Sequence, residues 1–200
     1  TTFNFYSDAT GPDPDSSSPT LRRYHRLLWS KELPNGKLFT LSEERVDTYL
    51  YHTSGLGEFF LSSDGITNSY GHHKRKKEVV EQIPEIVNEV YDVGSTIGGY
   101  IIFPYNRVEG LQTINQTRGR DRRIDDRFDL TLECIRRYYL GEESPLYPTL
   151  LGYKSFFDLF EDFSGYVRFF FLDDLLDEGG KVRFCLPFDN FNTQPGFRTT

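Results

Sequence analysis

Apolar residues recur at helical spacing in several parts of the chain. Ser18 and Pro19 are typical of a helix cap and a first helical residue, and the apolar positions after them predict a helix over 19–30. A second helical pattern covers residues 79–90. The clearest pattern is that of residues 124–140, where one apolar face lies opposite a fully polar face.

The chain beyond residue 140 is rich in aromatic residues. We expect the preceding helix to end at Gly141, because glycine commonly follows a last helical turn. Two further aromatic helices are predicted over 147–162 and 166–177, divided at the Ser164-Gly165 pair. A closing strand is predicted over 182–188.

Alternating apolar and polar residues predict several short strands. Three runs separated by Gly and Ser predict a small antiparallel sheet, namely 37–41, 48–52 and 58–61. Residues 3–6 and the apolar run 100–103 are also expected to be strands.

These elements predict an α+β fold in which residues 1–200 form a single compact domain. It should hold a small, mainly antiparallel sheet and aromatic-rich C-terminal helices. Aromatic residues make up 16% of the chain, so we expect them to dominate the core. The net charge of -7 argues against a protein that coats nucleic acid non-specifically, although it allows a local basic patch.

The two cysteines, Cys134 and Cys185, lie in apolar surroundings and lack the spacing of a metal site, so both are expected to be buried thiols.

The chain has no long apolar run and no basic-then-apolar leader, which predicts a cytoplasmic protein with no membrane partner. It starts at Thr1 and contains no methionine, so we expect its natural ends to lie outside these residues. The sequence names no cofactor.

The most polar stretch is 113–127, where five arginines and three aspartates surround one glycine before a helix start. Guanidinium groups bind phosphate through paired hydrogen bonds, and the free N–H groups of a helix start favour anions. Asparagine and glutamine could read a base or a ribose edge. The predicted ligand-binding residues are Asn115, Gln116, Arg118, Arg120, Arg122 and Arg123.

The same stretch also allows a purely structural interpretation. Asp125 and Asp126 near the helix start complement the helix dipole, as do arginines near its end. Asp129 and Glu133 can pair with arginines one turn further on. A structural salt-bridge network and a flexible phosphate-binding turn therefore remain two open alternatives.

A metal-independent reaction at a phosphodiester would need a proton carrier and a cation. His25 and His52 are the candidate proton carriers, and Asp129 and Glu133 are the candidate carboxylates that orient the reaction. His25 shares a helix face with Trp29, so a half-buried structural histidine is the alternative. The carboxylates have helical spacing, but the neighbouring arginines would neutralise them, and no metal site is predicted.

Three other polar or glycine-rich segments have weaker signals. The run GHHKRKKE at 71–78 could touch phosphates, although a solvated loop fits it as well. Residues 62–65 are expected to form a turn, because no nucleophile motif surrounds their serines. The glycines of 94–104 lack the spacing of a nucleotide-binding loop.

Three segments have long and unusual sequences. They are DPDSSSPTLRRYHRLLWSKELPNG, HTSGLGEFFLSSD, and TINQTRG followed by RIDDRFDLTLECIRRYYLGEESPL. Through them the chain resembles a family of uncharacterised bacterial proteins, defined only as a domain of unknown function, over most of its length. The resemblance implies a bacterial, cytosolic protein. It supplies no activity, ligand or catalytic residue.

The sequence thus leaves two functions open, and no motif names a reaction. The first is an intracellular bacterial enzyme or effector that acts on a nucleotide or nucleic acid through its arginine-rich turn. The alternative is a non-enzymatic interaction module, whose aromatic C-terminal helices face a protein partner or a second copy of the chain.

Overall fold

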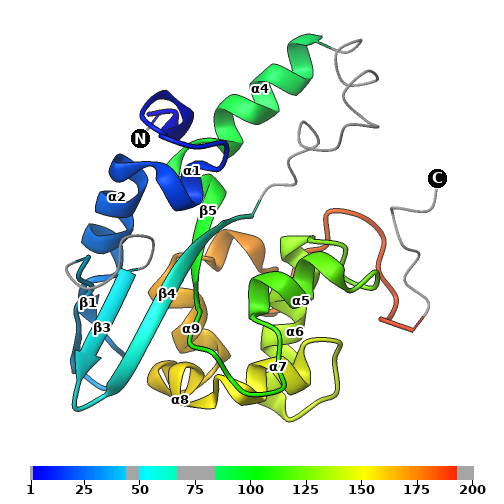
Figure 1. Cartoon of the computed structure of the whole chain (residues 1–200). Helices are drawn as coiled ribbons and strands as arrows, with labels where there is room; N and C mark the ends of the chain where they lie inside the picture. Colours follow the sequence, from blue (N-terminus) through cyan, green and yellow to red (C-terminus); the bar gives the residue numbers. More distant parts are fainter. Residues whose placement is uncertain (1, 44–49, 67–83, 193–200) are drawn as a thin grey trace.

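The computed structural model describes residues 2–43, 50–66 and 84–192 (Figure 1). It is an α+β fold with antiparallel strands, as the sequence predicts, although the described strands form two small sheets and not one. The larger sheet has the strand order β3-β4-β5, and the smaller one pairs β1 with β2. The strands are β1 (Lys31–Glu32), β2 (Leu38–Phe39), β3 (Leu50–Ser54), β4 (Gly57–Gly65) and β5 (Tyr100–Pro104).

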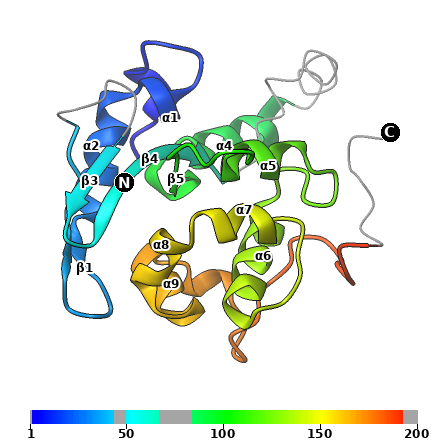
Figure 2. The ribbon, with the colours of Figure 1, turned by 60° about the horizontal axis from the view of Figure 1, so that its bottom comes forward.

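Short helices surround the sheet, and those after residue 127 gather on one side of it (Figure 2). The α-helices are α1 (Pro14–Ser17), α2 (Pro19–Trp29), α4 (Pro84–Gly94), α5 (Ile114–Arg120), α6 (Phe128–Leu140), α7 (Tyr147–Gly152), α8 (Lys154–Phe157) and α9 (Phe163–Phe170). The 3-10 helices are η1 (Phe5–Ser7), η3 (Ile97–Gly99), η4 (Asp158–Phe160) and η5 (Asp173–Leu175).

Local signals explain where α2 begins and where α6 ends. The Ser18 side chain accepts a hydrogen bond from the Leu21 N–H at 3.1 Å, which caps α2 as predicted. At the end of α6, Gly141 adopts the left-handed conformation, with φ of 70°. Both predictions are therefore confirmed.

The strand β4 has two faces with different surroundings. Phe59 and Leu61 point into the core, and Ser63 on the same face meets α2. Ser62 and Asp64 alternate with them and meet α5 on the opposite face. The expected turn at 62–65 is therefore wrong, because these residues pair with β5 to the end of the strand.

The core is aromatic, as predicted. The C-terminal helices bury six large rings, each at most 4% exposed: Phe156, Phe157, Phe160, Tyr166, Phe169 and Phe170. Tyr166 lies 4.8 Å from Phe170 and meets Phe160 edge-on at 5.4 Å, centre to centre. Each such pair adds about 0.5–1.5 kcal/mol beyond its burial.

The predicted boundary at Ser164-Gly165 is wrong, because both residues lie inside α9. The helix starts earlier, where the Asp162 side chain accepts a hydrogen bond from the Gly165 N–H at 2.7 Å. A Cβ on Gly165 would lie 2.0 Å from the Phe160 carbonyl oxygen. The glycine therefore permits close packing and does not break the helix.

Two predicted strands are absent from the described residues. Residues 3–6 lead into η1, where the Asn4 side chain caps the Tyr6 N–H. In 182–188, Val182 makes only an isolated bridge with Leu176. Cys134 is buried as expected, but Cys185 is exposed, because its segment is not a core strand.

Some predicted segments lie outside the described residues. They include the basic run 71–78 and the part of the 79–90 helix before Pro84. Among the helices that are described, none combines the length and the apolarity that crossing a membrane requires.

Candidate functional site

The arginine-rich stretch begins as a helix, so the predicted flexible turn at Arg118 and Gly119 is wrong. Thr113 caps α5 by accepting a hydrogen bond from the Gln116 N–H, and the Gln116 side chain accepts one from the Thr113 N–H, both at 3.3 Å. This reciprocal cap favours a helix from Ile114 onward. The turn proper begins at Asp121.

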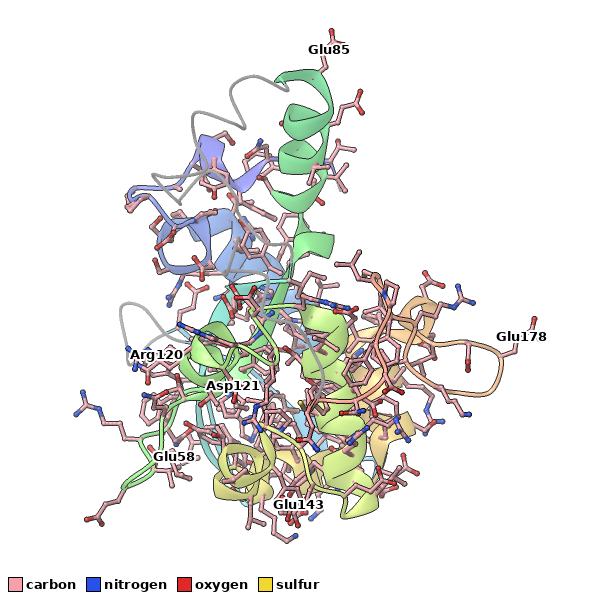
Figure 3. All side chains as sticks on the ribbon, turned by 90° about the vertical axis from the view of Figure 1, so that its right-hand side faces the viewer. Glu58, Glu85, Arg120, Asp121, Glu143 and Glu178 are labelled. Atoms are coloured by element: carbon pink, nitrogen blue, oxygen red, sulfur yellow. The ribbon has the colours of Figure 1, made fainter. Side chains whose placement is uncertain are left out.

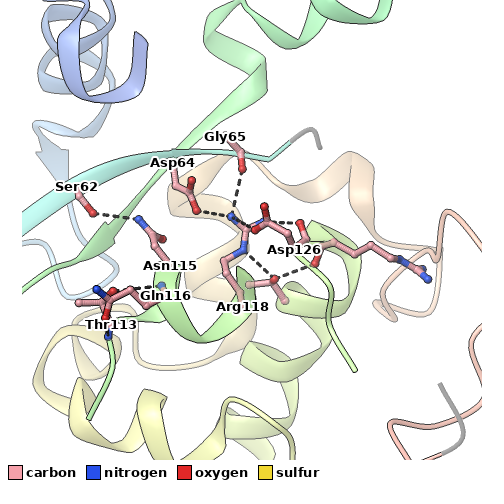
Figure 4. A network of polar contacts seen from close by, with 10 residues as sticks. Ser62, Asp64, Gly65, Thr113, Asn115, Gln116, Arg118 and Asp126 are labelled. Atoms are coloured by element: carbon pink, nitrogen blue, oxygen red, sulfur yellow. Dashed lines mark hydrogen bonds and ion pairs between the residues drawn. The ribbon is translucent and has the colours of Figure 1, made fainter. Parts of the chain in front are cut away.

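Arg118 is the centre of a polar network between α5, β4 and α6 (Figure 4). Its Nη1 donates to the Asp64 carboxylate at 2.5 Å and to the Gly65 carbonyl at 3.2 Å. Nε donates to Thr131 Oγ1 at 3.2 Å, and Nη2 donates to the Asp126 carbonyl at 3.0 Å. With a side chain 0% exposed, Arg118 presents no surface to a ligand.

The carboxylates around Arg118 are more open than the arginine itself. Asp64 is 25% exposed and Asp126 is 36% exposed, and Asp126 lies 3.5 Å from Arg118 Nη1. Burial raises the pKa of Asp64; the Arg118 charge opposes this shift, and the Asp126 charge adds to it. Two carboxylates thus share one buried cation.

Asp125 and Asp126 both have positive φ, 50° and 64°. Two successive non-glycine residues in this region are strained unless their surroundings hold them. Arg118 does so from both ends: its carbonyl accepts the Asp126 N–H at 3.0 Å, while its guanidinium binds the Asp126 carbonyl. Arg118 therefore fixes the shape of the turn.

Asn115 and Gln116, the predicted base-reading residues, are engaged within the protein. Gln116 completes the α5 cap. The Asn115 side chain donates to Ser62 Oγ at 3.1 Å, and its Oδ1 atom is buried without a partner among the described residues (Figure 4). Both side chains hold α5 in place.

Three of the predicted arginines do reach the surface. Arg120, at the end of α5, is exposed (Figure 3), and so is Arg122, in the turn. Neither forms an ion pair within the described ranges. Arg123 is 48% exposed and forms two hydrogen bonds to the Asp121 carboxylate, at 2.7 and 3.0 Å. Two guanidinium groups thus remain open to an anion.

His25 is a buried structural histidine. The Trp29 indole N–H donates to His25 Nδ1 at 2.9 Å, so the ring proton lies on Nε2, which contacts Ser63 Oγ at 2.9 Å. Burial lowers the pKa of His25 to about 3. In this tautomer, Nε2 cannot take a proton from Ser63.

His52 is also held inside the fold. Nδ1 lies 2.8 Å from the Thr40 carbonyl oxygen, and Nε2 lies 2.8 Å from Ser54 Oγ. The ring stacks on Phe39, with 4.2 Å between the ring centres. Burial lowers the pKa of His52, although its hydrogen bond to Thr40 opposes the shift.

The two predicted carboxylates lie on α6 and pair with arginines. Asp129 forms two hydrogen bonds with Arg127 and also accepts the Cys185 N–H at 2.8 Å. Glu133 binds Arg136 and Arg137 at 2.7 and 2.8 Å. Burial of Glu133 would raise its pKa, but these arginines lower it overall.

The structure does not assemble these predicted catalytic residues into one site. His25 and His52 meet the β4 face that carries Ser63, whereas Arg118 meets the face that carries Asp64. The sheet therefore separates the histidines from the arginine-rich segment. A metal centre has no support either: among the described residues, no three His, Cys, Asp or Glu side chains could hold an ion.

Sequence reasoning missed the acidic surroundings of Arg118. Asp64 comes from β4, far away in the sequence, and Asp15 of α1 is a further carboxylate nearby. Burial raises the pKa of Asp15 to about 7, and the charges of Asp64 and Asp13 add to the shift. One sequence signal could have revealed that Asp64 faces Arg118. Ser62 and Asp64 alternate with buried residues along the strand, so their side chains point to the opposite face of the sheet.

Comparisons with known proteins agree with the resemblance in the sequence. The model of a family of unknown function (DUF6994) matches residues 1–200. The chain belongs to this family. The comparison with curated proteins and the comparison with solved structures found no match.

For this member of the family, the geometry separates two tasks within the arginine-rich segment. Arg118 binds the carboxylate and carbonyl groups of its own chain, while Arg120 and Arg122 face solvent. A buried arginine that fixes a turn and exposed arginines next to it are suited to binding an anion. They supply no nucleophile.

Proposed function

We propose that this protein binds the phosphate groups of a nucleotide or nucleic acid at the turn that joins α5 to α6. The ligand-binding arginines are Arg120 and Arg122, with Arg123 beside them. The carrying observation is that Arg120 and Arg122 are exposed and have no carboxylate partner among the described residues. An exposed guanidinium without an internal partner can form two hydrogen bonds to a phosphate.

Arg118 supports the proposal as a positioning residue. It cannot contact a ligand while it is buried, but it binds the backbone of the turn at Asp126. A turn held in one conformation loses less entropy when it binds a ligand. The net charge of -7 makes long-range attraction of nucleic acid weak, so the proposed binding is local.

Catalysis is not part of the proposal. His25 and His52 lie on the far face of the sheet from Arg118, and Asp129 and Glu133 are paired with arginines. Their predicted catalytic roles remain predictions without a shared site. A bacterial, cytosolic setting belongs to the proposal, and the family resemblance in the sequence supports it.

The alternative function, an interaction surface on the aromatic helices, has less support. Six of the large rings in these helices are at most 4% exposed, so they form the core. Phe171, at the end of α9, is the one large aromatic residue of 147–176 among the exposed hydrophobic side chains. A single exposed ring is a small basis for a protein partner.

Two matched double variants test the proposal. Arg120→Gln with Arg122→Gln removes the proposed ligands, whereas Arg23→Gln with Arg107→Gln removes two other exposed arginines as a control. Binding of ATP, GTP, NAD and single strands of RNA and DNA of roughly 12 nucleotides would be measured by thermal shift and fluorescence anisotropy. A ligand at 100 times its Kd should add about 2.7 kcal/mol of stability.

We expect at least one probe to bind the unchanged protein. The Arg120/Arg122 variant should bind that probe about tenfold or more weakly than the unchanged protein. The affinity of the control should stay within about threefold of the unchanged protein's. For a single-stranded probe, the dependence of log K on log salt should also fall by about 0.7 per lost phosphate contact. Equal weakening in both variants, or no binding of any probe, would contradict the proposal.

A further inference from the structure

Three aromatic rings converge on the ammonium group of Lys31, on β1. Its Nζ atom lies 3.6 Å from the ring centre of Phe171, 4.7 Å from that of Phe169 and 5.4 Å from that of Trp29. Aromatic faces attract cations that lie within about 6 Å of the ring centre. We call the rings of Trp29, Phe169 and Phe171 the aromatic cage.

Two walls of the aromatic cage are built into the core. Trp29 is 5% exposed and Phe169 is 4% exposed, and their rings stack with 6.2 Å between the centres. The Trp29 indole N–H donates to His25 Nδ1 at 2.9 Å, which fixes the orientation of the indole ring. These two walls are therefore held by contacts that do not involve Lys31.

The third wall opens the aromatic cage to solvent. Phe171 ends α9 with a φ of 56°, in the left-handed region, and its side chain is 62% exposed. Its ring lies 5.7 Å from that of Trp29, centre to centre. Bulky residues rarely adopt this conformation, and those that do cluster at ligand sites.

The aromatic cage suits a quaternary ammonium group better than it suits Lys31. A lysine ammonium has three N–H donors, and the rings offer no acceptor to them. Lys31 forms no ion pair in the described part of the chain, and burial lowers its pKa to about 8, the direction expected when a charged amine loses water. A quaternary ammonium has no N–H group, so it gains the attraction of the rings without losing hydrogen bonds.

We propose that the aromatic cage binds a small quaternary ammonium compound, which displaces the Lys31 side chain into solvent. The flexible stem of the lysine allows this movement. Three exposed carboxylates lie within three residues of a cage ring in the sequence and attract a cationic ligand, those of Glu32, Asp173 and Asp174. This inference is independent of the phosphate-binding proposal, because it uses none of the same residues.

A fluorescence titration of the full chain tests the proposal, because Trp29 is its one tryptophan and forms a wall of the aromatic cage. The probes are choline, trimethyllysine and a neutral analogue of choline in which a tert-butyl group replaces the trimethylammonium group. Lys31→Ala removes the competing side chain. In that background, Phe171→Leu removes one ring face at an exposed position and keeps an apolar side chain.

We expect Lys31→Ala to bind choline or trimethyllysine at least about tenfold more tightly than the unchanged protein, because the ligand no longer competes with a tethered cation. The neutral analogue should bind at least about fivefold more weakly than choline, and adding Phe171→Leu should weaken choline binding by about fivefold. Tighter binding of choline would indicate a free compound as the ligand, and tighter binding of trimethyllysine a modified side chain; both results support the proposal.

Three results would overturn the proposal. They are affinities for choline and trimethyllysine that Lys31→Ala does not raise, equal binding of choline and its neutral analogue, and choline binding that Phe171→Leu leaves unchanged. Each would leave the three rings as partners of Lys31 alone.

Discussion

Replacing Asp15 with asparagine should stabilise this protein at neutral and alkaline pH. Asp15 lies in the first turn of α1, and α1 packs against β4, the strand that carries Asp64. Burial raises the pKa of Asp15 from 3.8 to about 7, with further contributions from the negative charges of Asp64 and Asp13. An asparagine keeps the shape of the side chain and cannot ionise.

The size and sign of the effect follow from linkage. The shift is about three pKa units, and each unit corresponds to about 1.4 kcal/mol, so ionised Asp15 costs the folded protein at most about 4 kcal/mol. Because the pKa is higher in the folded state, the native protein retains a proton between about pH 4 and pH 7 that the unfolded chain loses. Stability therefore falls as pH rises through this window.

Urea denaturation of the unchanged protein and of Asp15→Asn measures this effect. Between pH 4 and pH 8 the difference in unfolding free energy should grow by about 2–4 kcal/mol in favour of the variant. Partial exposure of Asp15 sets the lower end of that range. The matched control is Asp174→Asn, which removes an exposed aspartate elsewhere in the chain.

The reasoning would be refuted if the difference in unfolding free energy between Asp15→Asn and the unchanged protein stayed constant from pH 4 to pH 8. It would mean that Asp15 has the same pKa in the folded and unfolded states. Neither burial nor repulsion from Asp64 would then disfavour its ionised form in the folded protein. The control should show a constant and small difference. A rising difference in the control as well would assign the effect to net charge and not to Asp15.

Three further substitutions test the buried contacts of Arg118 and of the aromatic core. Arg118→Ala should cost about 3–5 kcal/mol in urea denaturation, because it leaves Asp64 without its cation; a loss below about 1 kcal/mol would contradict this. Tyr166→Phe should be neutral or stabilise by about 1 kcal/mol, because the buried hydroxyl has no partner among the described residues; a clear fall in Tm would reveal one. Gly165→Ala should destabilise by about 3 kcal/mol, since its Cβ would meet the Phe160 carbonyl oxygen, and an unchanged Tm would speak against that close contact.

The predictions that held were those with a local physical cause. The caps at Ser18 and Gly141 depend on neighbouring backbone groups, so the sequence shows where α2 and α6 begin or end. The predictions that failed assumed that a local pattern was sufficient. In 182–188 the apolar residues suit a strand, but in the described part of the chain their only pairing is the isolated bridge at Val182.

The candidate site shows the same division. Its arginines, its short distance from a helix start and its excess of cations can be read from residues 113–127. The sequence could not say which arginine would be buried, because Arg118 is matched by Asp64, a residue 54 positions earlier in the chain. The expected glycine turn became a helix because Thr113 and Gln116 cap it.

The sequence by itself determined the α+β class, the aromatic character of the core and the ends of the best-signalled helices, because these depend on composition and on contacts within a few residues. Only the tertiary structure decided which charges are neutralised internally and which reach solvent. Burying a charge requires a partner, and the partner comes from whichever strand or helix the fold brings alongside. In this protein that choice buries Arg118 beside Asp64 and leaves Arg120 and Arg122 exposed.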